Sequence, residues 1–430
     1  MPGLKIKSDY FPLIFILAGS ALLKGFYVFK VTPYSDFLFS DMGGYYQAAW
    51  DLFKGDPHAL GIYAINPPAF PLFLSFFFRL GHALKVFPFG IEPVLLLNIL
   101  LSTLSAAAFY FISLRIFKSW TAAFILTCVN AFSFSVFYYN AFILTENFSN
   151  PLVLIAVFFL FLGDNRAWAL FFSGLILGAA ISARPAYGLA VVPFLLYIFF
   201  MPYPVFRSIF RCAIFSIACL GMIGGIIFKI KDVSKGRLIG VSSGGGLNFM
   251  IAQCQPRSVA SAAGGYVKLP STIDKPEYGD WTTGRPFFDQ EYFYSLGLGC
   301  IRQRGPAFFW KNLAAFKSFF IGPLFPSSDR PAWGLKLLQI VRGFDALLIL
   351  SVPLLFFFLQ TLFFDRLKLI FIFGLIFWNL TTLFLFSDAE QRYFYSFEPF
   401  LLILSGSVLL GFLKFSRRVS KEKSPLFLVP

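Results

Sequence analysis

Charged residues are scarce in this chain of 430 residues, in which Asp, Glu, Lys and Arg together make up 13% of the sequence. Apolar residues account for 58%, and Phe alone occupies 62 positions. Ordinary soluble domains have roughly a quarter of their residues charged, so this composition excludes a water-soluble globule. Because a helical crossing needs about 20 apolar residues, and about ten such stretches are present, the sequence predicts an all-α polytopic membrane protein.

Histidine is nearly absent as well, since the chain has only His58 and His82. The pattern Gly240-x-Ser242-x-Gly244 resembles a serine nucleophile elbow, but that chemistry needs a later histidine as its base, and none follows Ser242. A histidine-rich zinc site is equally unsupported. The sequence therefore requires no cofactor and gives no indication of a divalent metal.

The five cysteines fall into two groups. Three lie in or beside predicted spans, where small apolar packing residues are the expected role; they are Cys128, Cys212 and Cys219. Cys254 and Cys300 share the one long polar stretch, at 230–333. If that stretch lies in an oxidising compartment, we expect the two to form a disulfide. The alternative is a pair of unrelated thiols.

Charge orients the predicted spans. The spans are expected at about 10–30, 91–114, 119–138, 147–163, 167–183, 186–201, 212–229, 334–362, 369–386 and 399–414. Every short turn on one side of this arrangement is basic, with Arg115 and Lys118, Arg166, Arg207 and Arg211, and Arg366 and Lys368. The positive-inside rule places these turns and both termini in the cytoplasm. The net charge of +15 then reflects topology and anionic lipid, and no nucleic-acid partner is predicted.

This topology divides the chain into three parts. Residues 1–229 form an N-terminal transmembrane module with a first outer loop at 31–90, residues 230–333 a larger periplasmic loop region, and residues 334–430 a C-terminal transmembrane module. Two amphipathic stretches in the first outer loop, 41–54 and 69–85, suit helices that lie in the membrane interface.

Two small-residue motifs fall inside predicted spans. They are Gly174-x-x-x-Gly178 and Gly221-x-x-x-Gly225. Glycines at this spacing allow two membrane helices to approach closely, so both motifs predict close helix packing.

The first outer loop contains the most informative pattern in the chain. It consists of Asp41 followed by Tyr45, Ala49, Leu52 and Gly55, with Asn66-Pro67-Pro68 and Pro71 downstream. This spacing resembles the first outer loop of GT-C glycosyltransferases, the superfamily of the protein O-mannosyltransferases and of the bacterial transferase that adds aminoarabinose to lipid A. The resemblance implies a polyprenyl-phosphate sugar donor and Asp41 as general base, with Asp36 as its alternative. The supporting candidates in this loop are Tyr45, Tyr46 and Asn66.

Three later segments strengthen the resemblance. They are Thr145-Glu146, the stretch from Gly174 to Arg184-Pro185, and Arg392-Tyr393 followed by Pro399. By this likeness Arg184 and Arg392 bind the donor phosphate, and Tyr393 supports them. For both arginines the alternative is snorkelling to the interface without a ligand. For Glu146 two roles are open. It could orient the acceptor or an arginine, or it could form a structural ion pair.

Lys24, inside the first span, is a weaker candidate for the same phosphate, because its long side chain could simply reach the interface.

Transfer from a lipid phosphate needs a base for the acceptor and cations for the departing phosphate. We therefore expect a glycosyltransferase of the bacterial inner membrane, with its active site facing the periplasm and a lipid, glycan or protein as acceptor. Two alternatives remain. An O-antigen polymerase or ligase is disfavoured by the lack of histidine after His82. A lipid-linked sugar flippase or transporter would place polar or broken-helix features at mid-membrane, whereas the candidate residues here cluster at one rim.

Overall fold

The protein is described by a computed structural model that covers residues 11–31, 41–56, 67–84, 91–164, 166–233, 241, 245–254, 290–307, 310, 365–386 and 395–423. Over these ranges the chain forms helices and turns and contains no strand, which confirms the all-α class. Five features predicted from the sequence lie outside the described residues: Asp36, Asn66, Arg392, Tyr393 and the span at 334–362.

The described ranges form helical elements, numbered in chain order. They are α1 (Phe11–Phe26) with a π-helical turn η1 (Tyr27–Val31), α2 (Asp41–Lys54), α3 (Ala69–Ala83), α4 (Glu92–Phe117), α5 (Trp120–Ala131), α6 (Phe134–Tyr139), α7 (Thr145–Leu162), α8 (Ala167–Ala183), η3 (Pro185–Ala190), α9 (Val191–Phe199), α10 (Val205–Val233), α11 (Gly245–Cys254), α13 (Gln290–Arg304), α16 (Arg366–Phe386) and α17 (Glu398–Lys423).

Four helical stretches in the described ranges are long and apolar enough to cross a membrane: Pro12–Val31, Glu92–Phe117, Thr145–Leu162 and Val205–Asp232. Several shorter apolar helices accompany them, among them α8 and the run Pro185–Phe199. The membrane character predicted from composition is therefore confirmed, whereas the number of ten spans stays a prediction.

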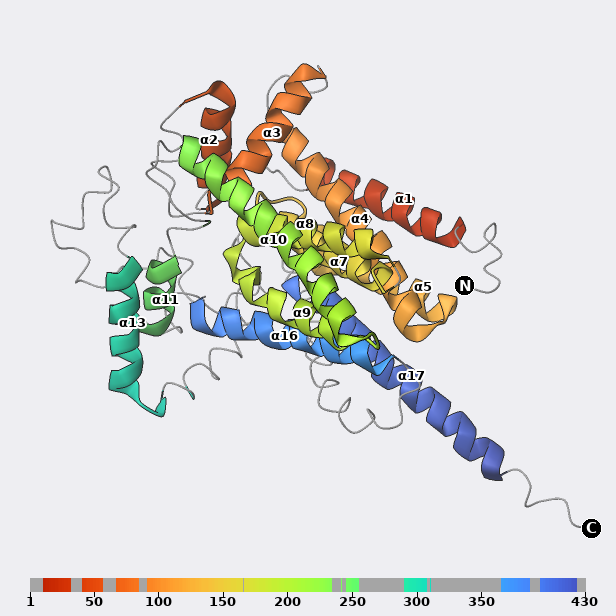
Figure 1. Ribbon diagram of the computed structural model, residues 1–430. Helices are drawn as coiled ribbons and strands as arrows, with labels where there is room; N and C mark the ends of the chain where they lie inside the picture. Colours follow the sequence, from red (N-terminus) through yellow and green to blue (C-terminus); the bar gives the residue numbers. More distant parts are fainter. Residues whose placement is uncertain are drawn as a thin grey trace, which may run out of the picture.

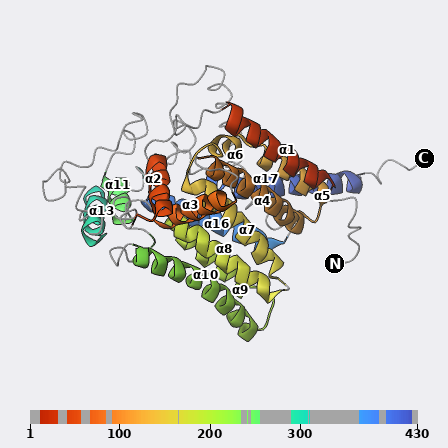
Figure 2. The same ribbon diagram turned by 90° about the horizontal axis from the view of Figure 1, so that it is seen from above.

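The long helices pack as a bundle with α7 and α8 at its centre (Figures 1 and 2). Aromatic and branched side chains from α4, α7, α8, α9, α10, α16 and α17 fill the core; examples are Phe109, Leu160, Leu177, Phe194 and Phe400. On α10 the large side chains Phe206 and Phe228 point away from this core and are exposed. Such an apolar surface suits contact with lipid.

Close packing between α8 and α10 depends on the first glycine motif. A Cβ atom built on Gly174 would lie 2.4 Å from the carbonyl oxygen of Phe215, and one on Gly178 would lie 2.7 Å from that of Cys219. Neither position leaves room for a side chain, so the prediction for this motif is confirmed.

The corresponding prediction for Gly221 and Gly225 is wrong within the described part of the chain. A Cβ atom at either position would meet nothing within 4 Å. Neither glycine therefore packs closely against another described helix.

The expected single span at 119–138 is interrupted. α5 ends at Ala131, and α6 begins three residues later, after Ser133. Ser133 has an extended backbone, and its hydroxyl accepts a hydrogen bond from the Val136 amide. A serine that caps a new helix competes with continuation of the old one, which explains the break.

The bundle has two distinct ends. At one end the carboxylate of Asp164 lies 3.3 Å from Lys368 Nζ and 3.9 Å from an Arg115 nitrogen, so basic turns meet there as the topology predicts. α10 begins at Val205 rather than near 212. Arg207 and Arg211 therefore lie in its first two turns and not in a loop, because the turn that precedes them is shorter than expected.

The opposite end holds α2 and α3, and α10 reaches them with its last turns (Figure 1). There Leu52, Ala69 and Ile230 form a small apolar cluster. α1 begins and α17 ends on the side away from α2 and α3 (Figure 1). The side of the membrane on which the two termini lie stays a prediction.

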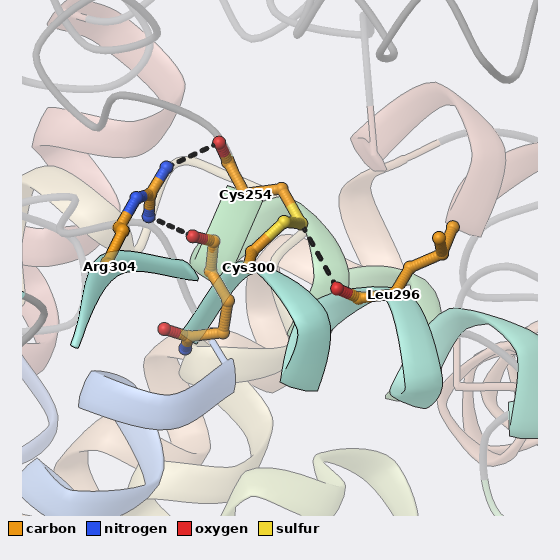
Figure 3. Close-up of a disulfide and its surroundings, with 5 residues drawn as sticks. Cys254, Leu296, Cys300 and Arg304 are labelled. Carbon is orange, nitrogen blue, oxygen red and sulfur yellow. Dashed lines mark hydrogen bonds between the residues drawn. A yellow bond between two sulfur atoms is a disulfide. The ribbon is translucent and has the colours of Figure 1, made fainter. Parts of the chain in front are cut away.

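A helical hairpin of α11 and α13 lies beyond this second end (Figure 1). Cys254 and Cys300, the pair proposed from the sequence, form a disulfide with their Cα atoms 5.3 Å apart (Figure 3). Arg304 donates hydrogen bonds to the carbonyl groups of Gln253 and Cys254, which end α11 (Figure 3). The Gln253 amide donates to the Leu385 carbonyl oxygen at 2.6 Å and so connects the hairpin to α16.

Candidate functional site

α2 places Asp41 at the edge of a buried aromatic cluster. Asp41 is the first residue of the helix, and its side chain lies outside what the structure describes. The next residue, Met42, is buried, as is Tyr45 one turn further on. The Tyr45 ring lies 5.0 Å from that of Phe70 on α3, which lies 5.9 Å from that of Phe148 on α7. Three rings thus connect the start of α2 to the start of α7.

Tyr46, the neighbouring candidate, faces α3 and is half-buried. Its ring stacks with Trp50 and makes an edge contact with Phe78. Burial, together with the negative charge of Glu92, raises the pKa of Tyr46 above its ordinary value. The phenol therefore keeps its proton and is able to donate a hydrogen bond at neutral pH.

At the same end of the bundle, Glu146 and Arg184 form an ion pair. An Arg184 nitrogen lies 2.7 Å from Glu146 Oε1, with the glutamate side chain 2% exposed and the arginine side chain 11% exposed. The Thr145 hydroxyl donates to Glu146 Oε2 at 3.0 Å and accepts from Arg184 at 3.1 Å. The pair is thus desolvated and held by a third polar group.

The helix geometry explains why these two residues meet. α7 and α8 run antiparallel, so the first turn of α7 lies beside the last turn of α8. Glu146 lies in the first turn of α7, and Arg184 directly follows the last residue of α8. A carboxylate at a helix N-terminus and a cation at a C-terminus both interact favourably with the helix dipoles.

Asn150 connects three segments beneath this pair. Its side-chain oxygen accepts hydrogen bonds from Tyr187 Oη in η3 and from Ser396 Oγ at 3.1 Å, directly before α17. The ring of Tyr395 lies 5.6 Å from that of Tyr139. The segment that follows Arg392 and Tyr393 in the sequence is therefore attached to the same end of the bundle as Arg184.

Sequence reasoning missed Asn150, Tyr187 and Ser396. A signal was available for the first of them, because Glu146, Asn147 and Asn150 crowd polar side chains into the start of an apolar span. Polar groups inside a span are costly unless they are paired, so such a run indicates a hydrogen-bond network.

Lys24, the weaker phosphate candidate, is fully buried in α1, so it does not take the alternative of reaching the interface. Its Nζ lies 6.0 Å from the centroid of the Phe137 ring on α6, and it has no hydrogen-bond partner in the described part of the chain. Val28, one helical turn further, belongs to the same apolar cluster as Met42 and Tyr45. The helix that carries the buried Lys24 amine thus contributes to the apolar cluster that contains the first turns of α2.

The described ranges contain no group of three His, Cys, Asp or Glu side chains that could hold a metal ion. These ranges do contain the helix that begins at Asp41, the arginine Arg184 with the carboxylate of Glu146 beside it, and the buried Lys24. Whether Arg392 converges with Arg184 stays a prediction, because Arg392 is not described.

One comparison with known proteins bears on this arrangement. Residues 66–228 match the dolichyl-phosphate-mannose-protein mannosyltransferase family, which is part of the GT-C superfamily. The matched stretch is less than half of the chain; it begins at Asn66 and contains Glu146 and Arg184, but not Asp41. No curated protein and no solved structure matched the chain. Over residues 66–228 the family match supports the resemblance drawn from the sequence motifs, whereas the motif residues Asp41 and Arg392 lie outside it.

Proposed function

We propose that the chain is a membrane glycosyltransferase of the GT-C type, a class that the family match at 66–228 supports, and that it transfers a sugar from a polyprenyl-phosphate donor to an acceptor at the outer face of a bacterial inner membrane. The observation that supports this best is the buried Glu146–Arg184 pair at the end of the bundle where α2 begins. A lipid phosphate at headgroup depth would meet these groups, whereas a soluble nucleotide sugar would need a separate domain.

Asp41 is the general base in this proposal and accepts the proton of the acceptor hydroxyl as the glycosidic bond forms. Its position at the start of a rim helix that packs through Tyr45 on α3 supports this role. Asp36 is the alternative base. Tyr46, Asn66 and Tyr393 are proposed to contact the substrates, with a lipid, a glycan or a protein as acceptor.

The charge balance of the site refines the role of each cation. Glu146 already neutralises Arg184, so Arg184 serves mainly as an oriented hydrogen-bond donor toward the phosphate. Lys24 has no hydrogen-bond partner among the described residues, so its amine remains available as a second donor in this proposal. Arg392 is the third proposed cation. Charge that grows on the departing phosphate is stabilised by such preorganised groups.

The base assignment is tested by transfer from a labelled polyprenyl-phosphate sugar with purified protein. Asp41→Asn should lower turnover about 10²- to 10⁴-fold, the usual cost of losing a general base. Asp51→Asn is the matched control, since Asp51 lies on the same helix and accepts a hydrogen bond from Gln47 at 2.7 Å. Near-normal turnover of Asp41→Asn with an inactive Asp36→Asn would move the role to Asp36. Failure of the wild type with every polyprenyl-phosphate sugar would overturn the proposal.

Convergence of Arg184 and Arg392 on one phosphate has its own test. Alanine at either position should lower turnover more than donor affinity, because the phosphate charge grows in the transition state. The double variant should cost less than the sum of the two single variants if both groups serve one phosphate. Strictly additive losses would refute the convergence.

The break between α5 and α6 favours a second candidate, a lipid-linked sugar flippase, because transporters use interrupted helices. Vesicles that contain the protein and a fluorescent polyprenyl-phosphate sugar distinguish the two. Movement of the lipid across the bilayer without sugar transfer would favour the flippase.

The proposed orientation is tested by labelling single cysteines from either side of the membrane. A reporter at 268–278 should react from outside, and one in the Lys414–Arg418 tail from the cytoplasm. If the reporter at 268–278 reacts only from the cytoplasm, the proposed sugar-transfer site would lie on the wrong side of the membrane for a lipid donor in the outer leaflet.

A further inference from the structure

Two arginines share one tyrosine ring at the end of the bundle opposite to α2. Arg207 Cζ lies 4.5 Å from the centroid of the Tyr203 ring, and Arg211 Cζ lies 4.6 Å from the same centroid. The two guanidinium groups are therefore no more than about 9 Å apart. Like charges this close repel each other, and a single anion placed between them would relieve the repulsion.

The carboxylate of Asp164 already has other partners and forms no ion pair with Arg207 or Arg211. Asp164 contacts Lys368 Nζ at 3.3 Å and an Arg115 nitrogen at 3.9 Å, and its Oδ1 accepts a hydrogen bond from Tyr197 at 3.0 Å. Arg207 forms no ion pair with a carboxylate in the described ranges. Positive charge is therefore in excess at this point.

Arg211 also retains an unused donor. The residue is only 3% exposed, and one of its terminal nitrogens donates to the Gly163 carbonyl group. Its Nε is buried and has no hydrogen-bond partner among the described residues. A buried guanidinium N–H without an acceptor is costly, and an anionic oxygen would satisfy it.

The surroundings of the two arginines are apolar. Phe206 beside them is 84% exposed, and Phe210 on the next turn is also exposed. Both belong to α10, one of the helices long enough to span the membrane. A ligand at this place would thus meet cations at its head and aromatic rings along its tail.

We propose that Arg207 and Arg211, both held against the Tyr203 ring, bind the phosphate of one anionic phospholipid, with its acyl chains along Phe206 and Phe210. The Tyr203 hydroxyl takes no part, because it donates to the Asp164 carbonyl group. Basic pockets at the cytoplasmic ends of membrane helices are suited to such headgroups. The site lies at the opposite end of the bundle from Glu146 and Arg184, so it is separate from the proposed sugar-transfer site. Its role is to attach the turn between α9 and α10 to the inner leaflet.

The test measures lipid-dependent stabilisation of the full chain in detergent. Thermal unfolding is followed by intrinsic fluorescence while phosphatidylglycerol or phosphatidylcholine is added to the micelles. Phosphatidylglycerol should raise the melting temperature of the wild type in a saturable way, and phosphatidylcholine should not. Arg207→Gln should weaken the apparent affinity for phosphatidylglycerol about fivefold, the factor expected for one arginine near an anionic lipid.

Lys229→Gln is the matched control, because Lys229 is an exposed cation near the other end of the same helix. Its response to phosphatidylglycerol should equal that of the wild type. If Arg207→Gln does not fold, Arg207→Lys keeps the charge without the planar fork and should show a smaller loss of affinity.

Three outcomes would overturn the proposal: equal stabilisation of the wild type by both lipids, an unchanged affinity of Arg207→Gln, or the same stabilisation by inorganic phosphate alone. The last would mean that the cluster binds a free anion and not a lipid.

Discussion

Replacement of Glu146 by glutamine should destabilise the protein strongly although it changes few atoms. Glutamine has nearly the shape of glutamate, so packing at the start of α7 is preserved. What is lost is the charge that faces Arg184 at 2.7 Å, in a place where the arginine side chain is only 11% exposed. Arg184 would then lose the carboxylate of Glu146 while its charge stays buried.

The structure sets the size of the effect. Removal of one partner of a buried ion pair costs about 3–5 kcal/mol, mainly because the remaining charge is left uncompensated. Thr145 still accepts a hydrogen bond from Arg184 at 3.1 Å, and one bond of this kind is worth about 1.5–3 kcal/mol when a charged group takes part. We therefore expect the lower end of the range, about 3 kcal/mol.

The assay is reversible unfolding of the purified protein in mixed micelles, with Glu146→Gln, Arg184→Gln and the double variant compared with the wild type. The double variant leaves no unpaired charge and should cost less than the sum of the single variants, by about 1–3 kcal/mol. The control is Asp232→Asn, because Asp232 and Lys229 form a pair of similar length, 2.9 Å, with both side chains 61% exposed. An exposed pair contributes about 0–1 kcal/mol.

Two results would refute this reasoning. The first is a loss for Glu146→Gln no larger than that for Asp232→Asn, which would mean that the pair at α7 and α8 is solvated. The second is strict additivity of the two single variants, which would mean that Glu146 and Arg184 do not interact.

Three further predictions follow from the packing and charge of described residues. Lys24→Met should raise stability and weaken donor binding, because it removes a buried unpaired charge that we assign to the donor phosphate; a stability loss with normal donor affinity would contradict this. Cys254→Ser should destabilise the α11–α13 hairpin by about 2–4 kcal/mol, as measured by hydrogen exchange, and unchanged protection would show that the disulfide is dispensable. Gly174→Leu should disrupt folding while Gly221→Leu should change stability by less than about 0.5 kcal/mol in thermal unfolding; similar losses for both would contradict the contacts at α8 and α10.

The position of several functional candidates was predictable because their sequence signals are local. A carboxylate at the start of an amphipathic stretch, a glutamate after a threonine and an arginine at the end of an apolar run all mark helix ends, as seen for Asp41, Glu146 and Arg184. The pairing of Glu146 with Arg184 was open from the sequence, where an orienting role and a structural ion pair were both allowed. Only the antiparallel contact of α7 with α8 decided that the two meet.

Predictions failed where the outcome depended on a partner helix. Gly174 and Gly221 each begin a motif with the same spacing, yet among the described helices only Gly174 lies against another helix. For Lys24 the sequence left open whether the side chain reaches the interface, and only the structure shows that it is fully buried, with its Nζ 6.0 Å from the centroid of the Phe137 ring. Ser133 was hidden in an apolar stretch, and its role as a helix cap appeared only from its backbone conformation.

The sequence by itself determined the membrane class, the all-α fold and the basic character of one side, because the bilayer acts on composition: apolar length sets the spans and Lys and Arg set their direction. It also indicated the GT-C superfamily through short motifs that the family match at 66–228 supports. The tertiary structure alone decided which polar groups meet, among them Glu146 with Arg184 and Asn150 with Ser396, 246 positions apart. Such contacts depend on the angles and depths at which whole helices pack, and no local pattern in the chain encodes these.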